Sequence, residues 1–222
     1  MITKTMINDA LRYMGISNPS GEIEMIKKVE ETFSHIEKWI QPKSVQGIFD
    51  LEKDGRITKL KNTLCTIESK DLARLLQNCD RGIIIAATLG INVDQEIMNR
   101  QRKSMLDAVV LDACCSVIID KVCDDIEAQL MLQLKENEFL TMRFSPGYGD
   151  VPLEVSSNIL SILNANKRIG LMQINSGMLV PTKSITAIIG ISHERENRQK
   201  NCGTCNLVKS CMYRKRGDRC GL

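Results

Sequence analysis

The sequence predicts an α+β fold in which a mixed or antiparallel sheet is flanked by long helices. Segments with helical periodicity and segments typical of strands are both present, and they do not alternate regularly along the chain. Of the 222 residues, 43% are hydrophobic and 26% are charged, which is enough apolar material for one sizeable globular core. A cysteine-rich, basic stretch at the C-terminal end differs in composition from this body.

Two amphipathic helices are expected first. Residues 2–14 carry apolar side chains near helical spacing, and residues 20–40 carry them every three or four positions until Pro42 ends the pattern. The second stripe consists of Ile23, Ile26, Val29, Phe33, Ile36 and Ile40. Trp39 is interpreted as a core or interface residue.

Strands are expected next, at 45–50 and 56–67, on either side of a hairpin turn at Lys53-Asp54-Gly55. Ser69 is a candidate N-cap for a helix that ends at Leu76.

A continuous apolar run at 81–89 is typical of a strand buried on both faces. Either Asn92 or Asp94 is expected to cap the following helix, which pauses near Ser104.

The longest element is expected at residues 104–136, where an apolar residue recurs every four positions and predicts one stripe on a long helix. The members of this stripe are Leu106, Val110, Cys114, Ile118, Val122, Ile126 and Leu130. Cys114 and Cys123 are interpreted as small buried apolar residues. Asp112 lies off the stripe and is expected to face solvent, with a contact to the ligand amine as the alternative.

Arg143 and the turn after it form the candidate binding feature. Arg143 lies on a strand-like run and is followed by Ser-Pro-Gly-Tyr-Gly, with glycines at 147 and 149. A guanidinium presents a planar fork of donors to a carboxylate or phosphate, and glycine lets a ligand approach the backbone closely. These residues alone fit either an anion-binding turn or a tight turn beside a surface arginine. A helix at 154–163 and strands at 169–174 and 184–191 are expected to complete the sheet.

Arg143, Gly147 and Tyr148 spell R-x-x-x-G-Y. The residues that follow in the same pattern are Pro152, Gly170, Met178, Pro181 and Ser184. Over residues 140–192, and less closely over 80–140, the chain resembles the activation domain of cobalamin-dependent methionine synthase, in a short, free-standing bacterial form. That resemblance implies that Arg143 pairs with the methionyl carboxylate of S-adenosylmethionine, and that Gly147 and Tyr148 shape the pocket around it.

The same resemblance implies an accessory role in methionine biosynthesis. The chain would hold S-adenosylmethionine for reductive methylation of inactive cob(II)alamin on a partner methionine synthase or related corrinoid protein, with flavodoxin or ferredoxin as electron donor. No catalytic residue of its own is implied, and little or no turnover is expected without the cobalamin-bearing partner. The segment 191–194 reads Ile-Ser-His-Glu and lacks the tyrosine pair that the family presents near the donor.

Four cysteines in the tail suggest a metal site. Cys202, Cys205, Cys211 and Cys220 give the spacing C-x2-C-x5-C-x8-C, which favours an iron–sulfur cluster over zinc, although a basic tail with reduced thiols also fits. Residues 193–222 carry a net charge of +5 while the whole chain carries +3. The expected division is therefore a domain at 1–192 and a tail at 193–222.

The composition argues against several other classes of protein. The start of the chain lacks a secretory pattern, no apolar run is long enough to span a membrane, and nine cysteines then indicate the reducing cytoplasm. Aromatic residues make up 4%, so nucleic-acid binding is disfavoured, although a zinc-containing tail that contacts RNA or DNA stays an alternative. Another alternative is an interaction subunit of a different corrinoid methyltransferase that binds no methyl donor.

The sequence contains two histidines, His35 and His193, and no hydrolase motif is found.

Overall fold

The computed structural model describes residues 2–16 and 21–195 and confirms the predicted α+β class. Its main sheet has six strands in the order β3-β2-β1-β4-β8-β5, and every neighbouring pair is antiparallel. The strands of this sheet are β1 (Lys43–Asp54), β2 (Ile57–Leu60), β3 (Thr66–Glu68), β4 (Cys79–Thr88), β5 (Phe139–Leu140) and β8 (Ser184–Ser192). A separate hairpin pairs β6 (Met172–Gln173) with β7 (Leu179–Val180).

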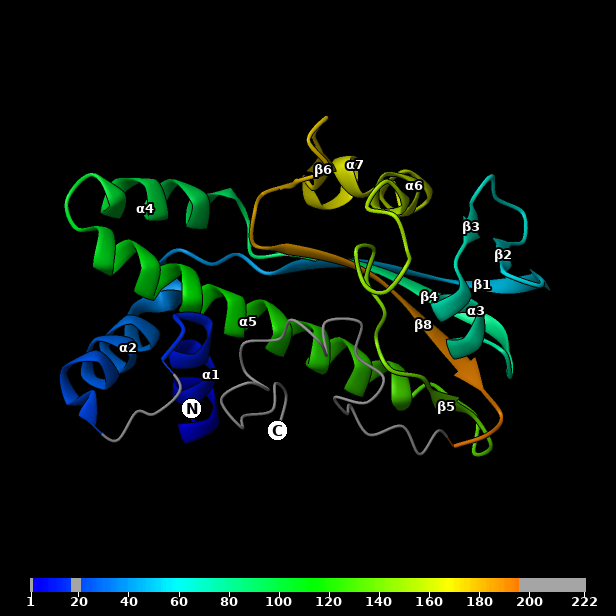
Figure 1. Cartoon of the computed structure of the whole chain (residues 1–222), viewed down its shortest axis with the longest axis horizontal. Coiled ribbons are helices and arrows are strands. Elements are labelled where there is room, and N and C mark those ends of the chain that lie inside the picture. The colour runs from blue at the N-terminus through cyan, green and yellow to red at the C-terminus, as the bar shows by residue number, and fades with distance from the viewer. Residues whose placement is uncertain (1, 17–20, 196–222) are drawn as a thin grey trace.

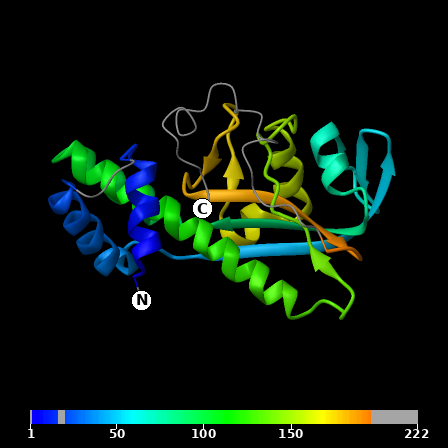
Figure 2. The same cartoon turned by 60° about the horizontal axis from the view of Figure 1, so that its bottom comes forward.

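Helices cover both faces of the sheet (Figure 1, Figure 2). The helices on the first face or beside its end are α1 (Lys4–Tyr13), α2 (Ile23–His35), a 3₁₀ helix (Ile36–Lys38), α4 (Ile91–Gln101) and α5 (Met105–Met131). The second face carries α3 (Lys70–Leu75), α6 (Val155–Ile162) and α7 (Ala165–Ile169). The longest helix, α5, runs across the first face and links the two ends of the molecule.

The central strand β4 separates two hydrophobic cores. Ile83 and Ile85 point into the core under α5, while Ile84 and Ala86 point into the core under α6 and α7. All four side chains are fully buried. Strand side chains alternate between faces, so a strand covered on both sides is apolar throughout, as the sequence pattern indicated.

The predicted cap at Ser69 is confirmed, because its hydroxyl accepts a hydrogen bond from the backbone N–H of Leu72. Ser104, near which the sequence predicted a pause between helices, caps α5 by accepting a hydrogen bond from the backbone N–H of Asp107. The predicted cap of α4 is wrong, because the helix begins directly after Gly90, whose φ of 90° turns the chain out of β4.

Two strand predictions need correction. The segment 56–67 forms β2 and β3 rather than one strand, because the chain reverses between them at Asn62, which adopts a positive φ of 63°. The segment 169–174 does not join the main sheet. Ile169 ends α7, and only Met172 and Gln173 pair, with the hairpin partner β7.

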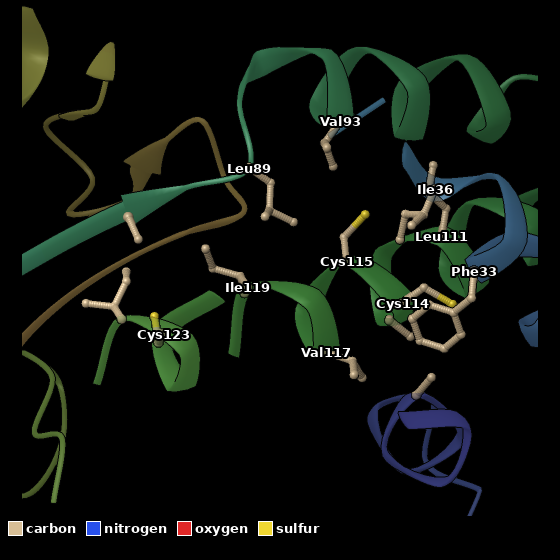
Figure 3. Close-up of a cluster of buried hydrophobic side chains, with 14 of the residues drawn as sticks. Phe33, Ile36, Leu89, Val93, Leu111, Cys114, Cys115, Val117, Ile119 and Cys123 are labelled. Atoms are coloured by element: carbon tan, nitrogen blue, oxygen red, sulfur yellow. The ribbon is translucent and has the colours of Figure 1, made fainter. Parts of the chain in front are cut away.

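The predicted stripe on α5 is also wrong in part. Leu106 is 45% exposed, and Ile118 and Val122 are only partly buried. An α-helix has 3.6 residues per turn, so side chains four residues apart differ in direction by about 40° around the helix axis. A repeat of four residues therefore moves gradually off one face over a helix of this length. Four of the predicted residues, Val110, Cys114, Ile126 and Leu130, are buried as expected. The buried face also includes Ala108, Leu111, Ala113, Cys115, Val117, Ile119 and Cys123. Figure 3 shows this face of α5, with Leu111 and Cys114 lying beside Phe33 and Ile36.

Within the described residues, the helices are either too short or too polar to cross a lipid bilayer.

Candidate functional site

Arg143 lies just beyond the end of β5, where the chain leaves the sheet edge. The next residue, Phe144, exchanges two backbone hydrogen bonds of 2.9 Å with Ile188 of β8. This single bridge fixes the backbone beside Arg143 and replaces the longer strand that the sequence predicted. The arginine is thereby held over the C-terminal half of α5.

The guanidinium of Arg143 forms two ion pairs with α5. Its Nη2 lies 3.1 Å from Oδ1 of Asp124, and its Nη1 contacts Oε1 of Glu127. These two acids are three residues apart and so lie on one side of the helix. The Arg143 side chain is only 17% exposed. Burial opposes its ionisation, but Glu127 and Asp124 outweigh that cost and hold the pKa of Arg143 above its ordinary value.

The glycine turn after Arg143 is closed by its own backbone. Gly147 donates a 2.8 Å hydrogen bond to the carbonyl of Val151, and Tyr148 donates a 3.0 Å bond to the carbonyl of Ser145. Gly147 has φ of 90°, and a Cβ there would lie 2.8 Å from Cδ2 of Leu153. Both the backbone angle and the space therefore require glycine.

Tyr148 presents an exposed ring next to the arginine. The ring packs edge-on against Phe144, with centroids 6.1 Å apart, and the residue is 58% exposed. Burial raises the pKa of Tyr148, and the carboxylate of Asp120 on α5 raises it further. Arg143 acts in the opposite direction. Arg143, Gly147 and Tyr148 are thus brought together on one side of α5.

Two residues that the sequence did not single out join this cluster. The hydroxyl of Tyr13, the last residue of α1, donates a 2.6 Å hydrogen bond to Oδ2 of Asp120. The pKa of Tyr13 is raised mainly by burial and by Asp120, and the nearby Tyr148 adds a smaller contribution. No local pattern signals a contact across 107 positions of the chain. We name Tyr13, Asp120, Asp124, Glu127, Arg143 and Tyr148 the arginine cluster.

Asp150 fastens the other end of the glycine turn to α3. Its carboxylate accepts hydrogen bonds from the backbone N–H groups of Lys70 and Asp71, at 2.8 and 3.2 Å, and from the hydroxyl of Ser69. These bonds, led by that of Ser69, lower the pKa of Asp150 against the effect of burial. The turn that carries Gly147 and Tyr148 is therefore fixed at both ends.

The four tail cysteines, Cys202, Cys205, Cys211 and Cys220, lie outside the described residues. Among residues 2–16 and 21–195, no group of histidine, cysteine or acidic side chains is arranged to hold a metal ion. Burial raises the pKa of Cys114, Cys115 and Cys123 to about 12, which makes these thiols inert, as expected for apolar core residues.

Asp112 is half exposed, as the sequence predicted, and its carboxylate lies 2.8 Å from Nζ of Lys183 rather than in the arginine cluster. Near the end of the described chain, Glu194 accepts a hydrogen bond from Asn78, and His193 is 3.7 Å from Asp80. Neither residue reaches the arginine cluster.

Comparison with solved structures shows a similar fold in a known protein. The chain is similar to a crystal structure of the MetH reactivation domain bound to AdoHcy, with a TM-score of 0.62, 12% sequence identity, and coverage of 83% of this chain and 70% of that chain. A scan against protein-family models and a search of curated proteins found no match. At this level of identity the match shows a shared fold, which agrees with the resemblance that the R-x-x-x-G-Y pattern indicated.

Proposed function

We propose that this domain binds S-adenosylmethionine at the arginine cluster and serves the reactivation of a cobalamin-dependent methionine synthase. The observation that carries the proposal is the position of Arg143, which lies among α5 carboxylates and beside the turn of Gly147 and Tyr148. The fold that the chain shares with the MetH reactivation domain supports it.

The charges of the cluster match those of the ligand. S-adenosylmethionine carries a carboxylate, an ammonium group and a sulfonium centre. Arg143 supplies one positive charge, while Asp120, Asp124 and Glu127 supply three negative charges on one side of α5. An anion-binding group surrounded by an excess of carboxylates suits a ligand whose single negative end is accompanied by two positive ones.

Arg143 has further N–H donors available for a ligand. A guanidinium offers five N–H groups, and the ion pairs with Asp124 and Glu127 hold it in a fixed orientation. A donor carboxylate would bind to the remaining N–H groups without a new rotamer, which lowers the entropic cost of binding. The exposed ring of Tyr148 would cover one side of the ligand.

The chemistry itself belongs to the bound groups. When bound, S-adenosylmethionine supplies a methyl group that passes, together with one electron, to the inactive cobalamin of the partner. This chain binds the methyl donor, orients it and leaves it open on the side where the partner docks. The tail cysteines are proposed to hold an iron–sulfur cluster, or zinc, and a flavodoxin or ferredoxin is the proposed source of the electron.

A reactivation assay tests this proposal. The full chain is mixed with a cobalamin-dependent methionine synthase in the cob(II)alamin form, a chemical reductant and S-adenosylmethionine labelled in its methyl group. We expect label on the partner's cobalamin with the wild-type chain and loss of labelling with Arg143→Ala. Arg168→Ala, at an exposed position of α7, is the matched control and should label normally. Absence of labelling with the wild-type chain would refute the proposed role.

A further inference from the structure

A second polar groove lies at the other end of α5, between α2, α4 and the first turns of α5. It has a volume of about 370 Å³, within the range of small-molecule sites. It is lined by Lys28, Glu31, Thr32, His35, Trp39, Arg100, Lys103, Ser104, Asp107 and Val110. Asp107 and Asp124 are separated by about 25 Å along α5 at 1.5 Å per residue. The groove is therefore distinct from the arginine cluster.

Arg100 is held rigidly in this groove. Its Nε donates a 3.0 Å hydrogen bond to Glu96, one turn earlier on α4. Its guanidinium lies 4.7 Å from the centre of the Trp39 ring, a cation–π distance. The side chain is 21% exposed. Within the part of the chain that the structure describes, its two terminal nitrogens have no hydrogen-bond partner.

The walls on either side of Arg100 are also fixed. Nζ of Lys28 on α2 lies 2.8 Å from Oδ1 of Asp107 on α5, and the hydroxyl of Ser104 bonds to the backbone N–H of Asp107. Beneath them, Phe33 and Leu111 belong to the close-packed core (Figure 3). The groove thus keeps its shape without a ligand, which is the condition for low-cost binding.

Charges of both signs surround the groove. Lys28, Arg100 and Lys103 are basic, while Glu31, Asp107 and the neighbouring Glu96 are acidic. Asp107 is paired with Lys28, and Glu96 accepts a hydrogen bond only from Nε of Arg100, so that among the described residues the terminal nitrogens of Arg100 stay open. The terminal edge of Arg100 and the ammonium of Lys103 are therefore the groups best placed to receive an anion.

We propose that this groove binds a small molecule through an oxyanion, either a carboxylate or a phosphate, which is held by the terminal nitrogens of Arg100 with help from Lys103. A guanidinium whose Nε is already bonded and whose face is stacked on an indole presents its outer edge as a planar fork, the arrangement that oxyanions accept. This binding site is independent of the S-adenosylmethionine site proposed above.

The chain offers a selective reporter for the test, because Trp39 is its single tryptophan. The full chain is titrated with inorganic phosphate and, separately, with succinate, at an ionic strength held constant with sodium chloride. We expect a saturable change in tryptophan emission with at least one of the two. The better ligand then identifies the source of the oxyanion.

Three variants test the role of Arg100. Arg100→Gln should weaken binding by about tenfold or more, since the charged fork is lost. Lys103→Gln, at an exposed position that does not affect folding, should weaken it by a smaller factor. Arg102→Gln, which removes an exposed arginine two residues away that does not line the groove, should bind as the wild type does.

Calorimetric titration of the same proteins guards against emission changes caused by altered packing on Trp39, and circular dichroism confirms that each variant is folded. The proposal is overturned if neither anion binds the wild-type chain. It is also overturned if the Arg100→Gln protein binds with wild-type affinity.

Discussion

The hydroxyl of Tyr13 lies 2.6 Å from Oδ2 of Asp120, and this hydrogen bond ties the end of α1 to the middle of α5. Asp120 is one helical turn before Asp124, which pairs with Arg143. The N-terminal helix therefore reaches the arginine cluster and contributes an aromatic ring to it.

Replacing Tyr13 with phenylalanine should lower the free energy of unfolding by about 1 kcal/mol at pH 7, because one hydrogen bond to a carboxylate is lost at a half-exposed site. Urea unfolding measures this loss. Burial and Asp120 raise the pKa of Tyr13, so its proton is held more tightly in the folded state than in the unfolded state. The wild type should therefore lose stability above about pH 10, where the unfolded chain ionises first. The Tyr13→Phe protein should lose less over the same range, and identical profiles would contradict this.

Gly147→Ala should destabilise the chain more than Gly170→Ala. Both glycines have positive φ, 90° and 72°, so both substitutions strain the backbone by about 1 kcal/mol. Only at Gly147 does the added Cβ also meet a side chain, Cδ2 of Leu153 at 2.8 Å, while Gly170 faces open space. Thermal unfolding of the two variants gives the comparison. Equal losses of stability would contradict the prediction, because they would show that the Leu153 side chain moves aside at no cost in free energy.

Asp150→Asn should loosen the glycine turn from α3. The carboxylate of Asp150 receives two backbone N–H groups and the Ser69 hydroxyl, and an amide accepts these bonds less well. At this exposed position we expect a loss of about 0.5–1 kcal/mol at pH 7, similar to a helix cap.

The effect of Asp150→Asn should depend on pH in one direction. Because the pKa of Asp150 is lowered by folding, its contribution is complete above about pH 4 and disappears as the pH falls through the folded pKa. Urea unfolding at pH 7 and pH 3 should show the difference between wild type and variant shrinking at the lower pH. A difference that grows on acidification would be inconsistent with this role.

Anaerobic purification tests the tail. If Cys202, Cys205, Cys211 and Cys220 hold an iron–sulfur cluster, the protein should be coloured, with broad visible absorbance, and should contain iron and acid-labile sulfide. Cys202→Ser with Cys205→Ser should remove the colour and abolish electron-dependent reactivation while S-adenosylmethionine binding remains. Zinc without visible absorbance would favour the alternative metal, and unchanged reactivation by the double variant would exclude an electron-carrying role.

Local patterns predicted the fold class and several element boundaries correctly. Ser69 caps its helix as expected, because capping depends on neighbouring backbone groups alone. The buried strand at 81–89 was recognisable because a strand covered on both faces is almost entirely apolar, as residues 82–87 are here.

Features that depend on distant parts of the chain were not predictable in this way. The partners of Arg143 are set by where α5 crosses the sheet, and the contact of Tyr13 with Asp120 depends on the packing of α1 against α5. The separation of β2 from β3 depends on a positive φ at Asn62, a residue type that tolerates this conformation without requiring it. Arg143, Gly147 and Tyr148 were identified through the resemblance, and their role in binding stays a prediction.

Isothermal titration with S-adenosylmethionine tests the central claim most directly. Wild type, Arg143→Ala, Arg143→Lys and the control Arg168→Ala are compared after circular dichroism has confirmed that each is folded. Loss of a partly buried, charge-assisted pair should weaken binding by about 2 kcal/mol or more, roughly 30-fold, in Arg143→Ala. Arg143→Lys should recover only part of that loss, because lysine lacks the planar fork. Wild-type affinity in Arg143→Ala, or no binding by the wild-type chain, would contradict the account.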